Sequence, residues 1–240
     1  MIGVLRGRVS RLEVLAAGAA LLVLGALVVI EPAILEAPFQ SSRTVAFTFG
    51  GTAIAAVAFV GLLALRVPAP VRLVVLGAPF VVVNAWLLTP FFEDDVVDEG
   101  FVASIDGAPR AGVVADGPDG ATTASPPGPV LVGSGSLRGL AGHRGSGEAG
   151  VFRDPTGVLT LRLEQLDIHN GPDLELYLVP GAEQRSPAAR SIHLGPLRGN
   201  VGNLTYELPA GTSLDPGPWT VLIWCEAFSV EFTAATLTVT

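Results

Sequence analysis

Residues 174–178, Leu-Glu-Leu-Tyr-Leu, alternate strictly between apolar and polar side chains. Residues 159–163, Leu-Thr-Leu-Arg-Leu, repeat the same pattern. Successive side chains of a β-strand point to opposite faces of the sheet, so a period of two is typical of a strand with one buried face. We therefore expect both segments to be strands that place their leucines in a hydrophobic core.

Similar short runs recur through residues 130–240, where glycine, proline and asparagine separate them. Frequent short strands between such turns favour an all-β sandwich or barrel, and this length is enough for one hydrophobic core. The expected strands cover residues 130–132, 150–153, 158–163, 174–179, 191–194, 204–208, 219–224, 229–232 and 236–240.

Residues 1–92 have a different composition, with apolar runs at about 12–30, 45–65 and 71–92. A helix of about 20 residues crosses the hydrocarbon core of a bilayer. The sequence therefore predicts an α-helical transmembrane region of three spans, with the lipid bilayer as a partner. The first run could instead be a cleaved signal peptide, but Glu31-Pro32 follows it rather than a pair of small residues.

The charges are unevenly divided between the two parts of the chain. Six arginines against three glutamates give residues 1–92 a charge of +3, whereas eight arginines against nineteen acidic residues give residues 93–240 a charge of -11. Five of the six arginines of the first part lie at one end of the expected spans: Arg6, Arg8, Arg11, Arg66 and Arg72. The positive-inside rule then predicts a multi-pass protein of the cell membrane, with a cytoplasmic N-terminus and an extracytoplasmic C-terminal domain.

The overall composition excludes several classes of function. Charged residues make up only 15% of the chain, the net charge is -8, and all 14 basic residues are arginine. A negative net charge argues against a nucleic-acid partner. The absence of lysine excludes any mechanism that needs a catalytic lysine.

Residues 93–129 are expected to be a linker between the two parts. An acidic cluster occupies residues 93–99, and glycine and proline dominate residues 106–129. Such a stretch has too little apolar surface to offset the entropy lost on ordering. The predicted domains are therefore a membrane anchor (1–92), a flexible linker (93–129) and a β-sandwich (130–240).

The chain has one cysteine, Cys225, in an expected strand where it shares a face with Val221 and Ile223 and where Trp224 shares the other face with Glu226. A free cysteine is often a small buried hydrophobic residue. A lone thiol in an oxidising compartment could also ligate a metal or haem or form an intermolecular disulfide. The sequence leaves both interpretations open.

Other motifs give weaker signals. Residues 145–150 match G-x-G-x-x-G, but a strand rather than a helix is expected to follow, so we interpret these glycines as turn residues. The three histidines, His143, His169 and His193, lack the spacing of a zinc site. There is no complete catalytic constellation, so a stand-alone enzyme is not expected.

Residues 170–178 read NGPDLELYL and are the centre of an ordered series of motifs in residues 130–239. This series resembles the DM-thirteen domain, a Skeletor-associated module often labelled an electron-transfer domain, and residues 170–178 are similar to that family's strand signature. Thr233 replaces the glycine usual in the last motif. The other matches are His143 with Gly147, residues 194–202, residues 206–209, residues 221–230 and residues 232–237.

This resemblance implies a β-sandwich akin to the DOMON group, some of whose members bind haem or sugars. The near-invariant cysteine for which the family has a proposed redox role corresponds to Cys225. Asp173 corresponds to the family's acidic residue, although an aspartate there is also expected as a turn cap. Tyr177, Trp224 and His143 are further candidate binding residues, and a haem or metal could be held through Cys225.

The sequence therefore predicts a membrane-anchored redox or electron-transfer accessory module that uses Cys225 and acts with a redox partner or an envelope protein. The alternative is a non-catalytic envelope module that binds a ligand or protein and in which the cysteine is structural. A third hypothesis is a sensor or scaffold subunit whose spans pair with other membrane proteins.

Overall fold

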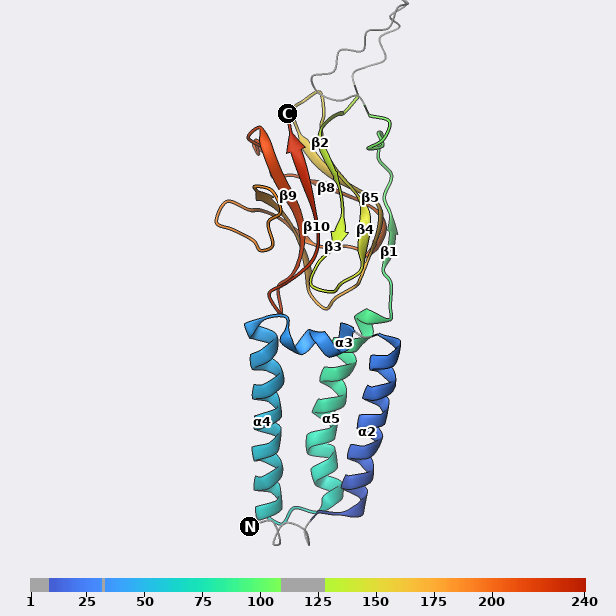
Figure 1. Ribbon diagram of the computed structural model, residues 1–240, viewed down its shortest axis with the longest axis vertical. Coiled ribbons are helices and arrows are strands. Elements are labelled where there is room, and N and C mark those ends of the chain that lie inside the picture. The colour runs from blue at the N-terminus through green and yellow to red at the C-terminus, as the bar shows by residue number, and fades with distance from the viewer. Residues whose placement is uncertain (1–8, 32, 109–127) are drawn as a thin grey trace, which may run out of the picture. The chain divides into compact units, whose positions relative to one another are not determined.

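The computed structural model describes residues 9–31, 33–108 and 128–240. The chain divides into two compact units, Met1–Phe92 and Glu93–Thr240. The first unit is helical and the second is built from β-strands (Figure 1). This division confirms the expected order of helices followed by an all-β region.

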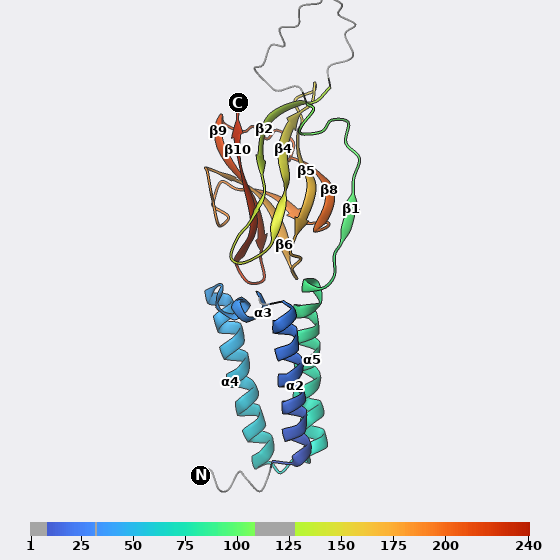
Figure 2. The same ribbon diagram turned by 45° about the vertical axis from the view of Figure 1, so that its right-hand side comes forward.

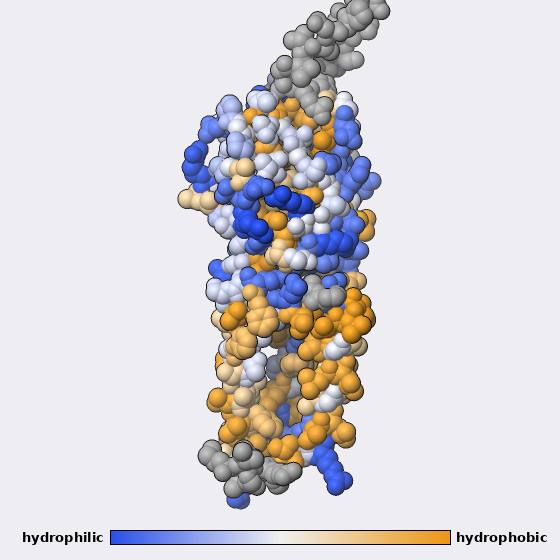
Figure 3. Space-filling view, in the orientation of Figure 1, coloured by the Kyte–Doolittle hydropathy of each residue, from blue (hydrophilic) through white to orange (hydrophobic). Residues whose placement is uncertain are grey.

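Three long helices form the first unit: α2 (Arg11–Ile30), α4 (Ser42–Ala64) and α5 (Ala69–Leu88). Each is long and apolar enough to cross a membrane, which confirms the three predicted helical spans in length and composition. Apolar residues cover most of the visible surface of this unit (Figure 3). Short helical turns connect or end the long helices: α3 (Ala33–Glu36), η1 (Ala37–Phe39) and η2 (Thr89–Phe91).

An ion pair joins α2 to α5 near the start of both helices. Glu13 forms a capping box with Ser10, the N-cap of α2. Arg72 donates from Nε to Glu13 Oε1 at 2.8 Å and from Nη2 to Glu13 Oε2 at 2.7 Å, and both side chains are buried. The two helices therefore begin at the same end of the unit.

Two sheets of five strands form the second unit. In the first sheet the strand order is β1-β8-β5-β4-β2, and in the second it is β3-β10-β9-β6-β7. The strands are β1 (Val96–Asp98), β2 (Val130–Ser136), β3 (Arg138–Gly139), β4 (Gly145–Arg153), β5 (Leu159–Ile168), β6 (Leu174–Pro180), β7 (Ile192–Pro196), β8 (Val201–Glu207), β9 (Gly217–Cys225) and β10 (Val230–Val239).

The core between the sheets contains the leucines of both alternating segments, as their pattern predicts. A smaller cluster lies on the outer face of the second sheet and includes Leu222 and Ala234. The loop from β6 to β7 approaches this face, since the backbone N–H of Glu183 donates to Thr236 Oγ1 and that of Gln184 donates to Thr220 Oγ1. The second sheet is therefore packed on both faces.

The last two expected strands are one strand in the structure. β10 runs without interruption from Val230 to Val239 and pairs with β9 along its length, with one register shift between Glu231 and Thr233. Residues 233–235, Thr-Ala-Ala, lack the large side chains by which strands are recognised in a sequence, yet all three are buried. The predicted break at residues 233–235 is therefore wrong.

The sandwich also begins earlier than the expected boundary at residue 130. β1 pairs in parallel with β8, and the views in Figures 1 and 2 both place it at the edge of the first sheet. Asn200 fixes this segment, since its Oδ1 accepts from the backbone N–H of Asp95 at 2.6 Å and its Nδ2 donates to Asp94 Oδ1 at 2.7 Å. Residues 93–108 are thus part of the second unit rather than linker.

Apolar contacts continue this attachment beyond β1. Ile105 packs with Leu131 and Phe152 in a separate buried cluster, and the rings of Phe101 and Phe152 lie 5.0 Å apart. Most of the glycine- and proline-rich stretch, residues 109–127, lies outside the described residues. Its role as a flexible tether stays a prediction.

Candidate functional site

Cys225 is the last residue of β9, and its side chain lies in the core between the two sheets. It faces inward with Val221 and Ile223, as the alternation predicts, and only 1% of it is exposed. Its cross-strand neighbours are Leu174 of β6 and Val230 of β10. The thiol is therefore enclosed by packed side chains.

Burial raises the pKa of the Cys225 thiol to about 11, and the negative charges of Asp173 and Glu226 act in the same direction. Backbone groups of Phe228 and Ala227 oppose this rise in pKa by hydrogen bonding. Because the thiolate is the nucleophile and the metal ligand, the folded chain holds Cys225 in its less reactive protonated form near neutral pH.

Asp173 lies in the turn before β6, and its backbone carbonyl accepts a hydrogen bond from the backbone N–H of Glu226 at 3.0 Å. Its side chain is exposed, and its role as a turn cap stays a prediction. The hydrogen bond joins the turn before β6 to the turn after Cys225. Asp173 therefore lies near Cys225 in the fold and is connected to the turn that encloses it.

Tyr177 and Trp224 lie on the outer face of the same sheet, away from the thiol. Trp224 is 9% exposed and packs with Leu222, and Tyr177 packs against their cluster. The Tyr177 hydroxyl donates to Glu226 Oε1 at 2.5 Å. Burial raises the pKa of Tyr177, and its hydrogen bond to Glu226 is the second cause.

Two further residues extend this cluster. The imidazole of His193 stacks on the Tyr177 ring, with 4.6 Å between centroids and 19° between planes. His193 Nε2 lies 2.6 Å from Glu175 Oε2. No spacing in the sequence indicates that Glu175, His193 and Glu226 meet here, because their proximity requires the strand order β7-β6-β9. The alternation of β6 does place Glu175 and Tyr177 on one face.

His143 lies in a different part of the sandwich, between β3 and β4. Its buried ring stacks on Phe232, with 3.7 Å between centroids, and meets the His169 ring edge-on at 5.8 Å. Burial lowers the pKa of His143 to about 4, and His169 adds to this effect. His143 is therefore a neutral, packed side chain at neutral pH.

The described residues offer no ready ligand set for a metal or haem. Among residues 9–31, 33–108 and 128–240, no group of three or more His, Cys, Asp and Glu side chains could hold a metal ion. The enclosed and protonated Cys225 thiol also lacks an open side toward which a haem iron could approach. Ligation through Cys225 does not fit this packing.

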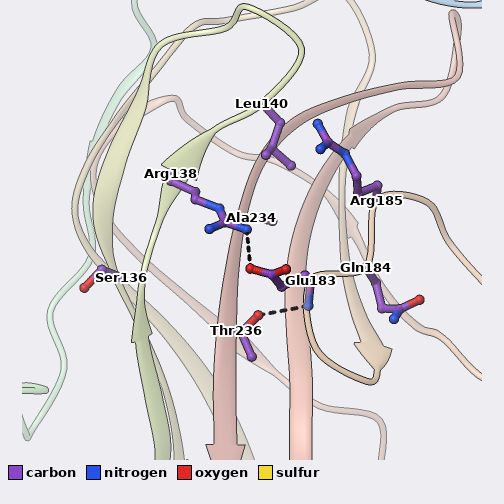
Figure 4. Close-up of a pocket in the computed structure, with 8 residues that line it drawn as sticks. All are labelled: Ser136, Arg138, Leu140, Glu183, Gln184, Arg185, Ala234 and Thr236. Atoms are coloured by element: carbon purple, nitrogen blue, oxygen red, sulfur yellow. Dashed lines mark hydrogen bonds and ion pairs between the residues drawn. The ribbon is translucent and has the colours of Figure 1, made fainter.

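The second sheet carries a shallow polar pocket at its edge, and none of the predicted site residues line it (Figure 4). Arg138 Nη2 lies 2.9 Å from Glu183 Oε1, and Arg185 Nε lies 3.0 Å from Glu231 Oε1. Leu140 and Ala234 supply apolar surface beside these charges. The pocket is lined by Ser136, Arg138, Leu140, Glu183, Gln184, Arg185, Ala234 and Thr236.

Comparison with known families finds one match, within the C-terminal half of the chain. Residues 137–237 match the family model described as Electron transfer DM13. The match contains all five predicted site residues and eight of the ten strands, but not the helices, β1 or β2. The resemblance predicted from the motifs is confirmed. No curated protein and no solved structure matches the chain.

Proposed function

We propose that the protein is a membrane-anchored electron-transfer accessory module that uses Cys225 as its redox thiol. The observation that carries this proposal is the family match, which spans residues 137–237, is described as electron transfer and includes the single cysteine. The three apolar helices supply the anchor. The module acts with a separate redox partner or envelope protein.

The packing of Cys225 restricts how this thiol can react. A buried, protonated thiol exchanges slowly with thiols and disulfides in solution. The four residues from Glu226 to Ser229 form the turn between β9 and β10 beside it. Local opening of this turn would expose the sulfur to a partner, so oxidation of Cys225 is gated by the fold.

We further propose an extracytoplasmic position for the sandwich. Arg6, Arg8, Arg11 and Arg66 support a cytoplasmic location for the N-terminus and for the turn between α4 and α5. Three spans then place the acidic second unit on the opposite side of the cell membrane. A C-terminal tag should be digested by protease added to intact spheroplasts; protection in intact but not in lysed spheroplasts would refute this topology.

The redox role is tested by trapping the thiol state of Cys225 in cells that express the full chain. Acid quenching and a mass-adding alkylating reagent under denaturing conditions distinguish reduced from oxidised cysteine. The proposal expects a fraction of Cys225 that resists the reagent until a reductant is added, and that grows with oxidant. A cysteine that stays fully reduced under all conditions would exclude this role.

The control uses the exposed side chain of Val102, which is 83% accessible. A Cys225→Ala, Val102→Cys chain places one thiol in solvent on the same unit. Oxidation of the cysteine introduced at position 102 reports the redox conditions of the compartment. If that cysteine is oxidised in the control chain while Cys225 stays reduced in the wild-type chain, the packing of the sandwich protects Cys225.

The second candidate is a non-catalytic envelope module in which Cys225 is structural. The enclosure of the thiol in the core favours it, and the pocket between Arg138 and Arg185 offers a surface for a polar ligand. Under this hypothesis Cys225→Ala retains function in cells, whereas Arg138→Ala combined with Arg185→Ala loses it.

A further inference from the structure

A tyrosine with a carboxylate at its hydroxyl lies on the outer face of the second sheet. Tyr177 extends from β6, and Glu226 follows the end of β9, the strand that pairs with β6. The Tyr177 hydroxyl donates a hydrogen bond to Glu226 Oε1, with 2.5 Å between the two oxygens. A base in hydrogen-bond contact can take a proton at the moment when the donor becomes acidic.

We propose that Tyr177 is a one-electron redox residue that transfers its phenolic proton to Glu226 when a metal-centred oxidant of a partner protein removes an electron. This inference rests on the proposed electron-transfer function and assigns it a second residue. In the forward step Tyr177 loses one electron to the oxidant and one proton to Glu226. The products are a neutral tyrosyl radical, a neutral Glu226 carboxylic acid and the reduced metal centre. Re-reduction by one electron returns the proton to the phenol.

The surroundings of Tyr177 favour removal of an electron. Asp173 and Glu175 lie near the ring together with Glu226, and all three act on it electrostatically. An electron leaves more readily from a site that is surrounded by negative charge, because the interaction energy falls when the site becomes less negative. His193, which stacks on Tyr177 and contacts Glu175, is the other titratable group at this cluster.

The chain contains one other tyrosine, and its environment is the opposite of that of Tyr177. The Tyr206 hydroxyl donates to the backbone carbonyl of Pro196 at 3.1 Å, which is a much weaker base than a carboxylate. The Arg198 guanidinium carbon lies 4.2 Å from the centre of the Tyr206 ring. A cation over the ring opposes loss of an electron. Tyr206 is therefore a matched internal control.

The Tyr177 side chain is also more exposed to solvent than the Tyr206 side chain. Tyr206 is 6% exposed, whereas Tyr177 is half-buried and its stacking partner His193 has a side chain that is 51% exposed. A partner can therefore approach the partly exposed Tyr177 side chain more closely than the buried Tyr206.

The experiment uses the full chain in detergent micelles with tris-bipyridyl ruthenium(III), generated by a light flash and a sacrificial acceptor, as the metal-centred oxidant. Electron paramagnetic resonance after freezing detects the radical, and ring-deuterated tyrosine identifies it as tyrosyl by narrowing its spectrum. We expect a tyrosyl signal in the wild type, the same signal in Tyr206→Phe, and its loss in Tyr177→Phe. A signal that persists in Tyr177→Phe would overturn the proposal.

Proton transfer to Glu226 is tested by the rate of radical formation near neutral pH. Glu226→Gln keeps a hydrogen-bond acceptor of the same shape but removes the base, so we expect the rate to fall by about tenfold or more. An unchanged rate would refute the role of Glu226. Far-UV circular dichroism and the thermal midpoint of each variant establish that the fold is retained.

These measurements are independent of the thiol. Cys225→Ala should leave the Tyr177 radical intact, so loss of the thiol role and loss of the tyrosine role have different signatures. A Tyr177 radical that forms in a chain whose Cys225 never oxidises in cells would remove the thiol from the proposed function and retain the tyrosine.

Discussion

The backbone N–H of Glu226 donates a hydrogen bond to the backbone carbonyl of Asp173 at 3.0 Å, and this bond joins the turns that precede β6 and follow β9. Cys225 lies directly before Glu226, and Leu174, its cross-strand neighbour, lies directly after Asp173. Residues 170–178 and residues 221–230, two of the motifs that resemble the family, therefore meet at one hydrogen bond beside the thiol. The bond restrains the turn that would have to open for Cys225 to react.

Removing this hydrogen bond should loosen the turn. Glu226→Pro deletes the donating N–H, and we expect it to lower the free energy of unfolding by about 1–3 kcal/mol. It should also raise the rate at which a maleimide labels Cys225 in the native chain. Glu226→Ala removes the same side chain and charge but keeps the donating N–H, so its labelling rate should stay well below that of Glu226→Pro. Equal labelling in both variants would show that the bond does not restrain the turn.

Cys225 should make stability fall at alkaline pH. Its pKa is raised to about 11 from an ordinary value of 9.0, so the unfolded chain releases the proton first. Stability from this group is fully present below pH 9 and is lost as the pH rises toward 11. The loss should approach about 2–3 kcal/mol relative to Cys225→Ala. Denaturant unfolding of both chains at pH 8 and at pH 11 measures it; parallel curves for the two chains would contradict the raised pKa.

His143 should make the stability of the fold decrease at acidic pH. Burial lowers its pKa from 6.5 to about 4, so the unfolded chain binds the proton first as the pH falls. Stability from this group is present above pH 6.5 and is lost between there and pH 4, by about 2–3 kcal/mol. His143→Phe keeps a ring to stack on Phe232 and should remove this part of the pH dependence. Thermal unfolding of both chains from pH 7 to pH 4 provides the comparison.

The sequence pattern predicted strands where they bury one face. The alternation at residues 159–163 and 174–178 lies within β5 and β6, and the inward position of Cys225 follows from the same periodicity. β1 could not be found in this way, because Val96 and Val97 lie among acidic residues. That strand forms through a non-local parallel pairing with β8, which is supported by the hydrogen bonds that Asn200 forms with Asp94 and Asp95.

The polar cluster at Tyr177 shows a second limit. Its members come from β6, β7 and the turn after β9, and no spacing along the chain indicates that they meet. Only the order of strands in the sheet brings Glu226 to the Tyr177 hydroxyl and His193 to its ring. Local periodicity gives the face of a strand but not its neighbours, so such clusters require the tertiary structure.

Arg162 should hold the segment after β1 on the sandwich. Its Nη1 donates to the Glu99 carbonyl at 2.6 Å and to Thr205 Oγ1 at 2.8 Å, and its Nε lies 3.3 Å from Glu164 Oε1. Arg162→Ala leaves the carboxylate of Glu164 without this buried partner, and we expect a loss of about 3 kcal/mol. Hydrogen exchange should then accelerate in residues 96–105.

The exposed pair of Arg138 with Glu183 provides the control. Both side chains are more than half exposed, at 61% and 69%, so Arg138→Ala should change stability by less than about 1 kcal/mol. Hydrogen exchange of residues 96–105 should stay at the wild-type rate. An Arg162→Ala chain with equally slow exchange there would show that the pairing of β1 with β8 is sufficient without the arginine.

The buried pair of Glu13 and Arg72 should determine how α2 and α5 associate. Arg72→Leu leaves the Glu13 carboxylate without its partner in an apolar helical unit, which costs about 3–5 kcal/mol where a buried ion pair is broken on one side. Glu13→Leu combined with Arg72→Leu removes both charges and should recover most of that loss. Disulfide cross-linking of cysteines introduced into the two helices, in a Cys225→Ala background, reports their association in membranes. The single variant should cross-link less than the wild type and the double variant nearly as much. Equal cross-linking in all three chains would mean that apolar packing alone holds α2 against α5.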